Sequence, residues 1–406
     1  MLFIKQALFR KLMLIGALNM KIVMPTFERI EWMPPTITLI QKLSEMGHEV
    51  VYITIYPDNY LPSLGLKNVR NVFLWPKEIW LTKKIPYIKG ISGLCFRVDN
   101  LVKKIIARKL SKTIKKEKTE ASLLWVVNEM TVILGGTSFL KHEKYLFTMY
   151  EMHEKTFLNR KIERAARNAA RVIVPEYNRA HIIKSRYSLN KLPIVLPNKS
   201  DIKINHIQLS PEAKEAVGRI KHAQLQGKKV ILYMGGIGPE RPLEPILDIC
   251  KNSEYRLAVM GRESEYLNQL EKKYGHVFDY LGSYTPPMHL AVAQYADIGL
   301  LMYVSINQVQ GLNALFCAPN KIYEYTGLGL PVIANDIPGL RFEVLSNKIG
   351  CVCDFEDRSA ILKDLNKIKN DYAQFSQNAK VYYKKIDVAQ IIDNIICIFC
   401  EENRQC

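Results

Sequence analysis

The stretch from residue 318 to 335 holds the side chains best suited to chemistry, A-P-N-K-I-Y-E-Y-T-G-L-G-L-P-V-I-A-N. Pro319 suits the first turn of a helix, where its missing N–H costs nothing. The free N–H groups and dipole of a helix start bind anions, and Asn320 and Lys321 lie there. Glu324 follows one turn later, and a carboxylate can accept hydrogen bonds from both hydroxyls of a ribose. The pattern predicts a nucleotide-sugar site; the alternative is an ordinary helix with a surface Glu.

The elements around these side chains follow from the next residues. We expect the helix to run through Tyr325 and to end at Gly327 and Gly329, which can adopt positive φ. Pro331 prevents the helix from resuming, and the apolar run 332–334 is typical of a buried strand.

A strand that leads into a glycine loop begins at Lys228. The loop holds Gly235 and Gly236, whose small size lets backbone N–H groups approach a phosphate closely. Arg241 follows and can hold a diphosphate through two parallel hydrogen bonds. The loop alone is a weak signal, and it gains weight only beside the 318–335 stretch.

A second group of chemical side chains follows the predicted strand 145–150. His153 lies just beyond it, with Glu151 and Glu154 on either side. Open α/β sheets bind their ligands at the carboxyl ends of their strands, so His153 is a candidate catalytic base. The alternative is a hydrogen-bonded surface histidine, and the two glutamates are lesser candidates.

The 318–335 stretch resembles the donor-site signature of GT-B glycosyltransferases, particularly family 4, also called group 1. Members of that family carry N-K-x-x-E-Y-M-A-x-G-x-P-V-I, followed by a strand and a Pro-Gly turn. The matching residues here are Asn320, Lys321, Glu324, Tyr325, Gly329, Pro331, Val332 and Ile333, then Pro338, Gly339 and Glu343. Gly327 replaces the usual Ala.

The resemblance implies an α/β protein with the GT-B fold, that is, two Rossmann-like doubly wound domains facing a cleft. It implies a donor loop at Gly235 and Gly236 with two basic residues for the diphosphate. Arg241 is one of them, and Arg262 is a candidate for the second. The family usually has an acidic residue eight positions before Glu324, where this chain has Phe316, so Asn313 is a candidate contact for the donor sugar.

Length and charge agree with two domains and an anionic partner. The chain has 406 residues and a formal net charge of +18. A nucleotide or an anionic membrane face fits this charge; nucleic acid is not expected, because no nucleic-acid motif occurs. The eight Cys lack zinc-site spacing and read as free thiols in a reducing compartment. We expect no required metal and no cofactor.

The most basic segment is 83–118, in which apolar residues recur at helical spacing. A basic amphipathic helix can lie on an anionic membrane; the alternative is a helix packed on its own domain with a solvated lysine face. Relatives that build polysaccharide on a lipid carrier favour the inner face of the cell membrane. The expected membrane-facing residues are Lys103, Lys104, Arg108, Lys112 and Lys115.

The expected organisation has five parts. Residues 1–19 are a leader or an over-extended start, because Met20 directly precedes a strand-like run; an export signal is the minority interpretation. Next come an acceptor-side domain at 20–198, a linker at 199–227, a nucleotide-sugar-binding domain at 228–385 and a final helix at 386–406 that packs back toward the first domain. We expect strands at 21–25 and 48–53, a helix at 36–46, and turns over 61–82.

These observations predict a cytoplasmic, peripheral membrane glycosyltransferase. It would move a sugar from a nucleotide-diphosphate sugar to a hydroxyl of a glycan or lipid-linked acceptor. The resemblance adds retention of configuration and a role in capsule, O-antigen or exopolysaccharide synthesis. The alternatives are a sugar-nucleotide epimerase of the same fold and a non-catalytic nucleotide-sugar-binding protein.

Overall fold

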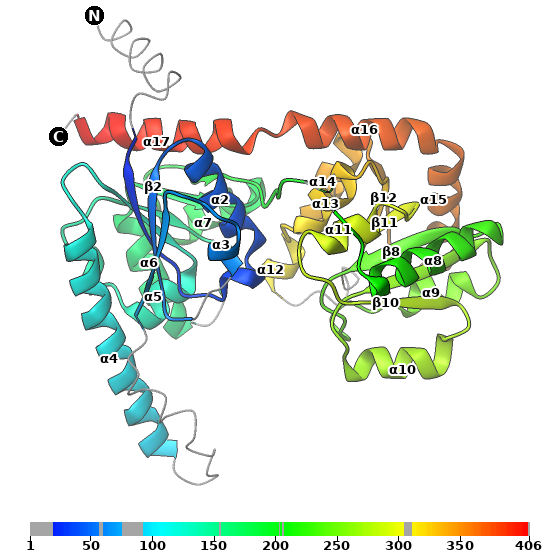
Figure 1. The fold of residues 1–406 in the computed structure, drawn as a ribbon, viewed down its shortest axis with the longest axis horizontal. Helices are drawn as coiled ribbons and strands as arrows, with labels where there is room; N and C mark the ends of the chain where they lie inside the picture. Colours follow the sequence, from blue (N-terminus) through cyan, green and yellow to red (C-terminus); the bar gives the residue numbers. More distant parts are fainter. Residues whose placement is uncertain are drawn as a thin grey trace, which may run out of the picture. The chain divides into compact units, whose positions relative to one another are not determined.

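The computed structural model describes residues 19–56, 60–74, 92–153, 156–202, 204, 207–303 and 311–404 (Figure 1). The chain divides into two compact units. Unit 1 comprises 1–197 together with 388–406, and unit 2 comprises 198–387. Each unit is built on one parallel sheet with helices, as expected for two Rossmann-like halves.

Unit 1 contains a parallel sheet of order β3-β2-β1-β4-β5-β6-β7. Its strands are β1 (Lys21–Pro25), β2 (Glu49–Thr54), β3 (Val69–Phe73), β4 (Leu123–Val127), β5 (Tyr145–Thr148), β6 (Arg171–Val174) and β7 (Ile194–Val195). The central strands β4 and β5 are buried throughout, because helices cover both faces. The sequence analysis missed β3 and expected turns there. This edge strand is only partly buried, so its sequence, V-R-N-V-F, lacks a continuous apolar run.

The helices of unit 1 include the last helix of the chain. They are η1 (Ile30–Trp32), α2 (Pro34–Glu45), α3 (Tyr60–Ser63), α4 (Ser92–Glu117), α5 (Glu129–Gly135), η3 (Ser138–Leu140), α6 (Thr156–Asn168), α7 (Tyr177–Arg186) and α17 (Val388–Arg404). α17 packs against α2, and its Glu402 forms ion pairs with Arg171 and Lys191. The Cys400 sulfur lies 3.8 Å from that of Met20, so the last helix contacts the start of the first strand.

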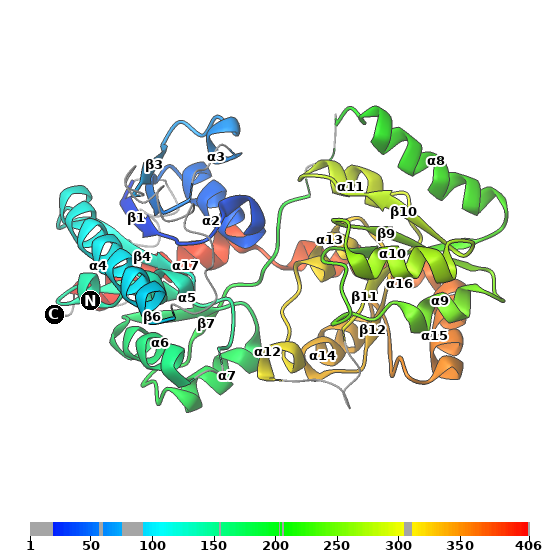
Figure 2. The ribbon, with the colours of Figure 1, turned by 90° about the horizontal axis from the view of Figure 1, so that it is seen from below.

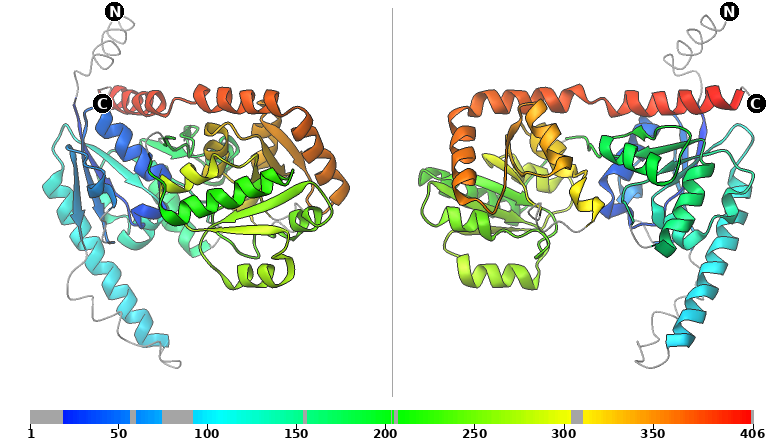
Figure 3. Two further views of the ribbon diagram at one scale, coloured as in Figure 1. Left: turned by 45° about the vertical axis from the view of Figure 1, so that its right-hand side comes forward. Right: turned by 180° about the vertical axis from the view of Figure 1, so that it is seen from behind.

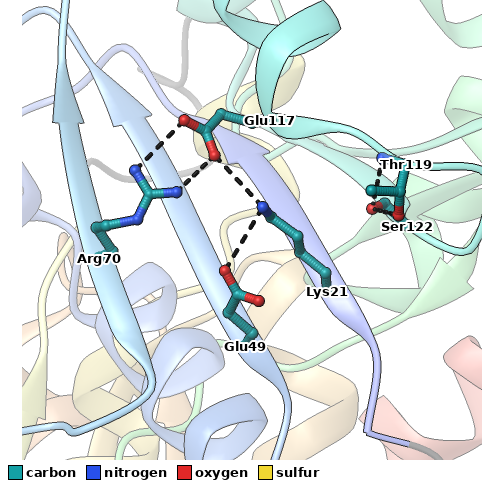
Figure 4. A network of polar contacts seen from close by, with 6 residues as sticks. All are labelled: Lys21, Glu49, Arg70, Glu117, Thr119 and Ser122. Atoms are coloured by element: carbon teal, nitrogen blue, oxygen red, sulfur yellow. Dashed lines mark hydrogen bonds and ion pairs between the residues drawn. The ribbon is translucent and has the colours of Figure 1, made fainter.

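α4 packs on unit 1 along one face. Ile106, Leu110 and Ile114 are buried on that face, and the helix contacts α5 and η3. Figures 1 and 3 show its N-terminal part, in cyan, extending beyond the sheet of this unit. At its C-terminal end, Glu117 accepts hydrogen bonds from Arg70 at 2.5 Å and Lys21 at 3.4 Å (Figure 4).

The Glu117 network ties α4 to the amino-terminal edge of the sheet. Lys21 and Arg70 come from β1 and β3, and Glu49 at the start of β2 lies 3.6 Å from the Lys21 ammonium (Figure 4). The hydrogen bond from Arg70 lowers the pKa of Glu117 below its usual value. Glu117 therefore stays ionised and holds the end of α4 to the sheet across the physiological range.

Unit 2 contains a parallel sheet of order β10-β9-β8-β11-β12-β13 (Figure 2). Its strands are β8 (Lys229–Met234), β9 (Tyr255–Met260), β10 (Phe278–Gly282), β11 (Ile298–Leu301), β12 (Val332–Asn335) and β13 (Gly350–Cys353). Alternate residues of β8 belong to two separate hydrophobic clusters, so both faces of the sheet are covered. This is the doubly wound pattern.

The helices of unit 2 supply those two layers. They are α8 (Pro211–Leu225), α9 (Glu244–Cys250), α10 (Glu265–Tyr274), α11 (Met288–Ala293), α12 (Leu312–Leu315), α13 (Asn320–Gly327), α14 (Pro338–Ser346), α15 (Arg358–Asn370) and α16 (Tyr372–Lys385). Buried residues of α8, α11 and α13 form one cluster, and those of α9, α10 and α15 form the other. α8 lies within 199–227, the expected linker, and packs on this sheet. None of the helices described in either unit is long and apolar enough to cross a membrane.

Candidate functional site

The strand order of unit 2 changes direction between β8 and β11. In open α/β sheets, ligands bind in the crevice beyond the carboxyl ends of the strands at such a switch point. Gly235 and Gly236 directly follow β8, and Tyr303 lies two residues after β11. The glycine loop predicted from the sequence therefore lies where the topology places a ligand.

α13 is fixed to this sheet by Tyr325. Its hydroxyl donates a hydrogen bond to the Leu232 carbonyl at 2.9 Å and accepts one from the Met234 N–H at 3.1 Å. The Tyr325 ring lies against Gly299, where a Cβ would come within 2.3 Å of the ring. A small residue in β11 therefore lets the helix approach, and the tyrosine fixes α13 beside the end of β8.

The start of α13 is held by a hydrogen bond from a side chain of the same unit. The Asn198 side-chain amide donates a hydrogen bond to the Ala318 carbonyl at 2.9 Å. Pro319 precedes the helix and makes no side-chain capping bond to it. Because a helix start carries N–H groups without intrahelical partners, this end of α13 can bind an anion.

Two cationic side chains converge on the glycine loop. Gly235 has φ of +122°, which favours glycine, and a Cβ there would lie 2.8 Å from Cε of Lys321. The same position lies 4.0 Å from a guanidinium nitrogen of Arg241. The Lys321 ammonium lies 5.2 Å from the Tyr233 ring centre, and the Arg241 guanidinium lies 5.2 Å from that of Tyr303. The arrangement suits an anion with more than one charge.

The charge of Lys321 is sensitive to its surroundings. The pKa of Lys321 is lowered to about 7, mainly by burial and in part by the nearby Arg241 guanidinium, while the charge of Glu324 opposes the shift. An anion bound between Lys321 and Arg241 would favour the protonated form, because an opposite charge raises the pKa of an ammonium.

Glu324 is buried, with 8% of its surface exposed, and it has a histidine beside it. Its Oε1 atom lies 3.6 Å from Nε2 of His289 on α11. The sequence analysis assigned no role to His289. Glu324 and His289 are far apart in the chain, so spacing could not reveal the pair; the only signal was a histidine shortly after the segment that forms β10.

The other predicted donor residues lie on several elements of unit 2, and their roles remain predictions. Asn320 is the first residue of α13, and Asn313 is partly buried in α12. Arg262 is exposed two residues after the end of β9. Phe316, at the position of the family's first acidic residue, directly follows α12. The structure therefore brings together Lys321, Arg241 and the glycine loop, with Glu324 one turn along the same helix.

His153 belongs to unit 1, beyond the carboxyl end of β5. Burial lowers the pKa of His153, and the negative charge of Glu151 opposes the shift. Glu129, which the sequence analysis missed, is fully buried at the end of β4 and accepts a hydrogen bond from the Glu151 N–H at 2.8 Å. Burial raises the pKa of Glu129 to about 8. Its position two residues after the apolar run 123–127, which forms β4, was the signal that could have found it.

The predicted membrane-facing residues lie on α4. Lys104, Arg108, Lys112 and Lys115 are exposed, and Lys103 is partly buried. Their spacing of four, four and three residues forms one stripe, opposite the packed apolar face described above. Because that apolar face is buried against unit 1, this part of α4 would have to bind a membrane through its charged side chains. Within the described ranges, no three His, Cys, Asp or Glu side chains group as a metal site would require.

Comparisons with known proteins find similarity in structure and none in sequence. No protein-family model matches the chain, and no curated protein matches it in sequence. Sucrose-phosphate synthase from Thermosynechococcus elongatus matches with a TM-score of 0.60 and 16% identity, over 95% of this chain and 98% of that one. Anabaena HepE in complex with UDP-glucose matches with a TM-score of 0.64 and 15% identity, over 96% and 100%.

A glycosyltransferase from Rickettsia africae matches with a TM-score of 0.61 and 12% identity, over 95% of this chain and 97% of that one. At these identities the similarity is one of fold. The features specific to family 4 stay predictions. The chain has the α/β fold of the GT-B glycosyltransferases.

Proposed function

We propose that this protein is a glycosyltransferase that moves a sugar from a nucleotide-diphosphate sugar to a hydroxyl of a glycan or lipid-linked acceptor. One observation carries the proposal, namely the convergence of Lys321 and Arg241 on the glycine loop beside the start of α13. Preorganised cations and helix N–H groups stabilise the charge that develops on a diphosphate leaving group. The HepE structures that match in fold contain UDP or UDP-glucose, which makes a uridine nucleotide the first donor to test.

The proposed reaction has a simple balance. The bond between the sugar's anomeric carbon and the diphosphate oxygen breaks, and the acceptor oxygen forms a bond to that carbon. The acceptor proton must leave, and we assign its removal to His153, whose lowered pKa keeps the imidazole neutral and able to accept it. Lys321, Arg241 and the helix start would carry the leaving group's charge without a metal. Retention of configuration and a place in polysaccharide synthesis are part of the proposal.

Attachment to the inner face of the cell membrane is also proposed, on different grounds. The exposed stripe on α4 gathers Lys104, Arg108, Lys112 and Lys115 on one face. Each Lys or Arg near an anionic membrane surface contributes on the order of 1 kcal/mol to binding. Four such residues would support reversible binding that high salt weakens.

A thermal-shift screen against UDP, GDP, ADP and CMP and their sugars tests the donor assignment. We expect stabilisation by one nucleoside diphosphate and its sugar, because a ligand that binds only the folded state raises the melting temperature. Its absence with every nucleotide would contradict the proposal.

Products then separate the rival activities. An epimerase would convert the sugar nucleotide without an acceptor. A binding protein would be stabilised but would turn over nothing with any acceptor. Transfer to an acceptor hydroxyl is the outcome that the proposal requires.

A further inference from the structure

We infer that His289 is a positioning residue, which holds the carboxylate of Glu324 in place to bind the ribose hydroxyls of the donor nucleotide. The inference rests on the proposed function, because it concerns the same donor site. It adds a residue from a different helix, α11, that neither the sequence pattern nor the comparisons assign.

The contact between the two side chains is close and shielded. Oε1 of Glu324 lies 3.6 Å from Nε2 of His289, and the two side chains are 11% and 16% exposed. Catalytic and binding contacts are often this long in unliganded structures and shorten when the ligand arrives. A buried carboxylate is costly without a compensating partner, and the imidazole of His289 lies where it can supply one.

The surroundings of His289 indicate how its proton is placed. Its Nδ1 atom is buried and has no hydrogen-bond partner among the described residues. A neutral imidazole carries one N–H, and only Nε2 faces an acceptor here. The proton is therefore best placed on Nε2, from which it points at Glu324.

In this geometry the two oxygens of the Glu324 carboxylate have different partners. Oε1 faces His289, which leaves Oε2 and the remaining lone pair of Oε1 for ligand hydroxyls. Lys321, on the preceding turn, lies against the glycine loop and the Tyr233 ring. Lys321 is thus directed toward the glycine loop, and His289 is the residue that holds Oε1 of Glu324 in place. A carboxylate that is already held in place loses less entropy when ribose binds.

The test compares a ribonucleotide with its 2′,3′-dideoxy counterpart. Binding of UDP and 2′,3′-dideoxy-UDP, or of the corresponding GDP or ADP pair if the screen selects that base, is measured by calorimetry on the full chain. We expect His289→Ala to weaken ribonucleotide binding about tenfold and dideoxynucleotide binding less than twofold. A histidine with a merely structural role would affect both ligands equally.

Two conservative variants form a matched pair. His289→Gln places an amide N–H near the position of Nε2 and should restore most of the ribonucleotide affinity. His289→Asn reaches only the position of Nδ1 and should not. Thermal melts of each variant confirm folding, and the Asn variant supplies the expected loss of ribonucleotide affinity if the Ala variant fails to fold.

Glu324→Gln separates this inference from the proposed function. If Glu324→Gln selectively weakens ribonucleotide binding but no His289 variant does, Glu324 binds ribose and the positioning role is wrong. If Glu324→Gln leaves both ligands unaffected, the donor assignment itself is wrong. Equal losses for both ligands in His289→Ala, or no loss for either, would overturn the inference.

Discussion

The Lys321 side chain gains or loses its proton near neutral pH. Burial, with help from Arg241, lowers its pKa to about 7, so the free site holds a mixture of charged and neutral forms. A diphosphate stabilises the charged form, and binding should therefore take up a proton. The strength of the donor site is then a function of pH, although the lysine's ordinary pKa lies near 10.4.

The first prediction concerns this proton. Above pH 7, Lys321 loses its charge in the free protein, so nucleoside diphosphate affinity should fall as pH rises, by up to about tenfold per pH unit. Lys321→Arg stays charged and should remove that part of the slope, since any titration of the ligand itself affects both proteins alike. Calorimetry at several pH values, in buffers of different ionisation enthalpy, measures the uptake; identical slopes in the two proteins would contradict the assignment.

At the scale of residues, the sequence predicts which side chains lie together only when they belong to the same helix or strand. Lys321 and Glu324 are three positions apart, so helical spacing alone places them on one turn. His289 and Glu129 escape such reasoning, because each acquires its neighbour through tertiary packing. A histidine in a short helix and a glutamate after a strand are common, so their positions in the sequence mark these two residues only weakly.

At the scale of elements, the proposed donor site depends on how α13 is anchored. The Tyr325 hydroxyl bonds to two backbone groups of β8, the strand that ends just before Gly235. The hydroxyl thus couples the helix that carries Lys321 and Glu324 to the strand that carries the glycine loop. This coupling is readable only from the structure, because the family pattern contains the tyrosine without revealing its partners.

Tyr325→Phe should test that coupling. The substitution removes the hydroxyl, so the buried Leu232 carbonyl and Met234 N–H each lose a hydrogen-bond partner. This should lower the free energy of unfolding by about 1–3 kcal/mol. Nucleoside diphosphate affinity should fall as well, because the helix start loses its fixed position. Tyr295→Phe is a matched control that keeps its ring and the Lys221 contact. Denaturant unfolding and calorimetry measure the two effects, and equal stability of both variants would show that the anchor is unimportant.

α4 shows where an amphipathic pattern leaves the function open. Helical spacing predicts its apolar and basic faces equally well under either interpretation in the sequence analysis. The structure packs Ile106, Leu110 and Ile114 inward, which leaves charge as the means of contact with a membrane. β3 illustrates the opposite limit, since an edge strand needs few apolar residues and leaves little pattern to detect.

The second helix-level prediction replaces the α4 stripe. Changing Lys104, Arg108, Lys112 and Lys115 to Gln should release the protein from vesicles containing phosphatidylglycerol, while donor binding stays unchanged. Changing four exposed lysines of unit 2, Lys214, Lys272, Lys273 and Lys363, removes the same total charge and should release it much less. Sedimentation with vesicles measures both, and equal release would mean that net charge alone, and not α4, drives attachment.

At the scale of the whole molecule, the fold class was readable because each unit repeats short apolar strands and helices in alternation. The expectation that the last helix packs back toward the first domain came from the family resemblance, because no local sequence pattern encodes contacts such as those of Glu402. Residues 1–18 lie outside the described part of the chain. Met20 is within it, and its N–H donates a hydrogen bond to Nδ1 of the buried His48 at 3.2 Å.

A chain that begins at Met20 should therefore fold. It retains β1 and a donor for His48, so we expect a melting temperature within about 2 °C of the full chain and unchanged nucleotide binding. Differential scanning calorimetry and the nucleotide screen check this. A large loss of stability would show that residues 1–19 belong to the core of unit 1.

The two crossings between the units have a consequence for synthesis on the ribosome. Unit 2 is one continuous segment, and its ends meet where Lys199 donates a hydrogen bond to the Ile386 carbonyl at 2.6 Å. Unit 1 is interrupted by that segment and is completed only when α17 emerges. The nascent chain therefore completes the synthesis of unit 2 before that of unit 1, and the first 197 residues must wait without α17 while residues 198–387 are added.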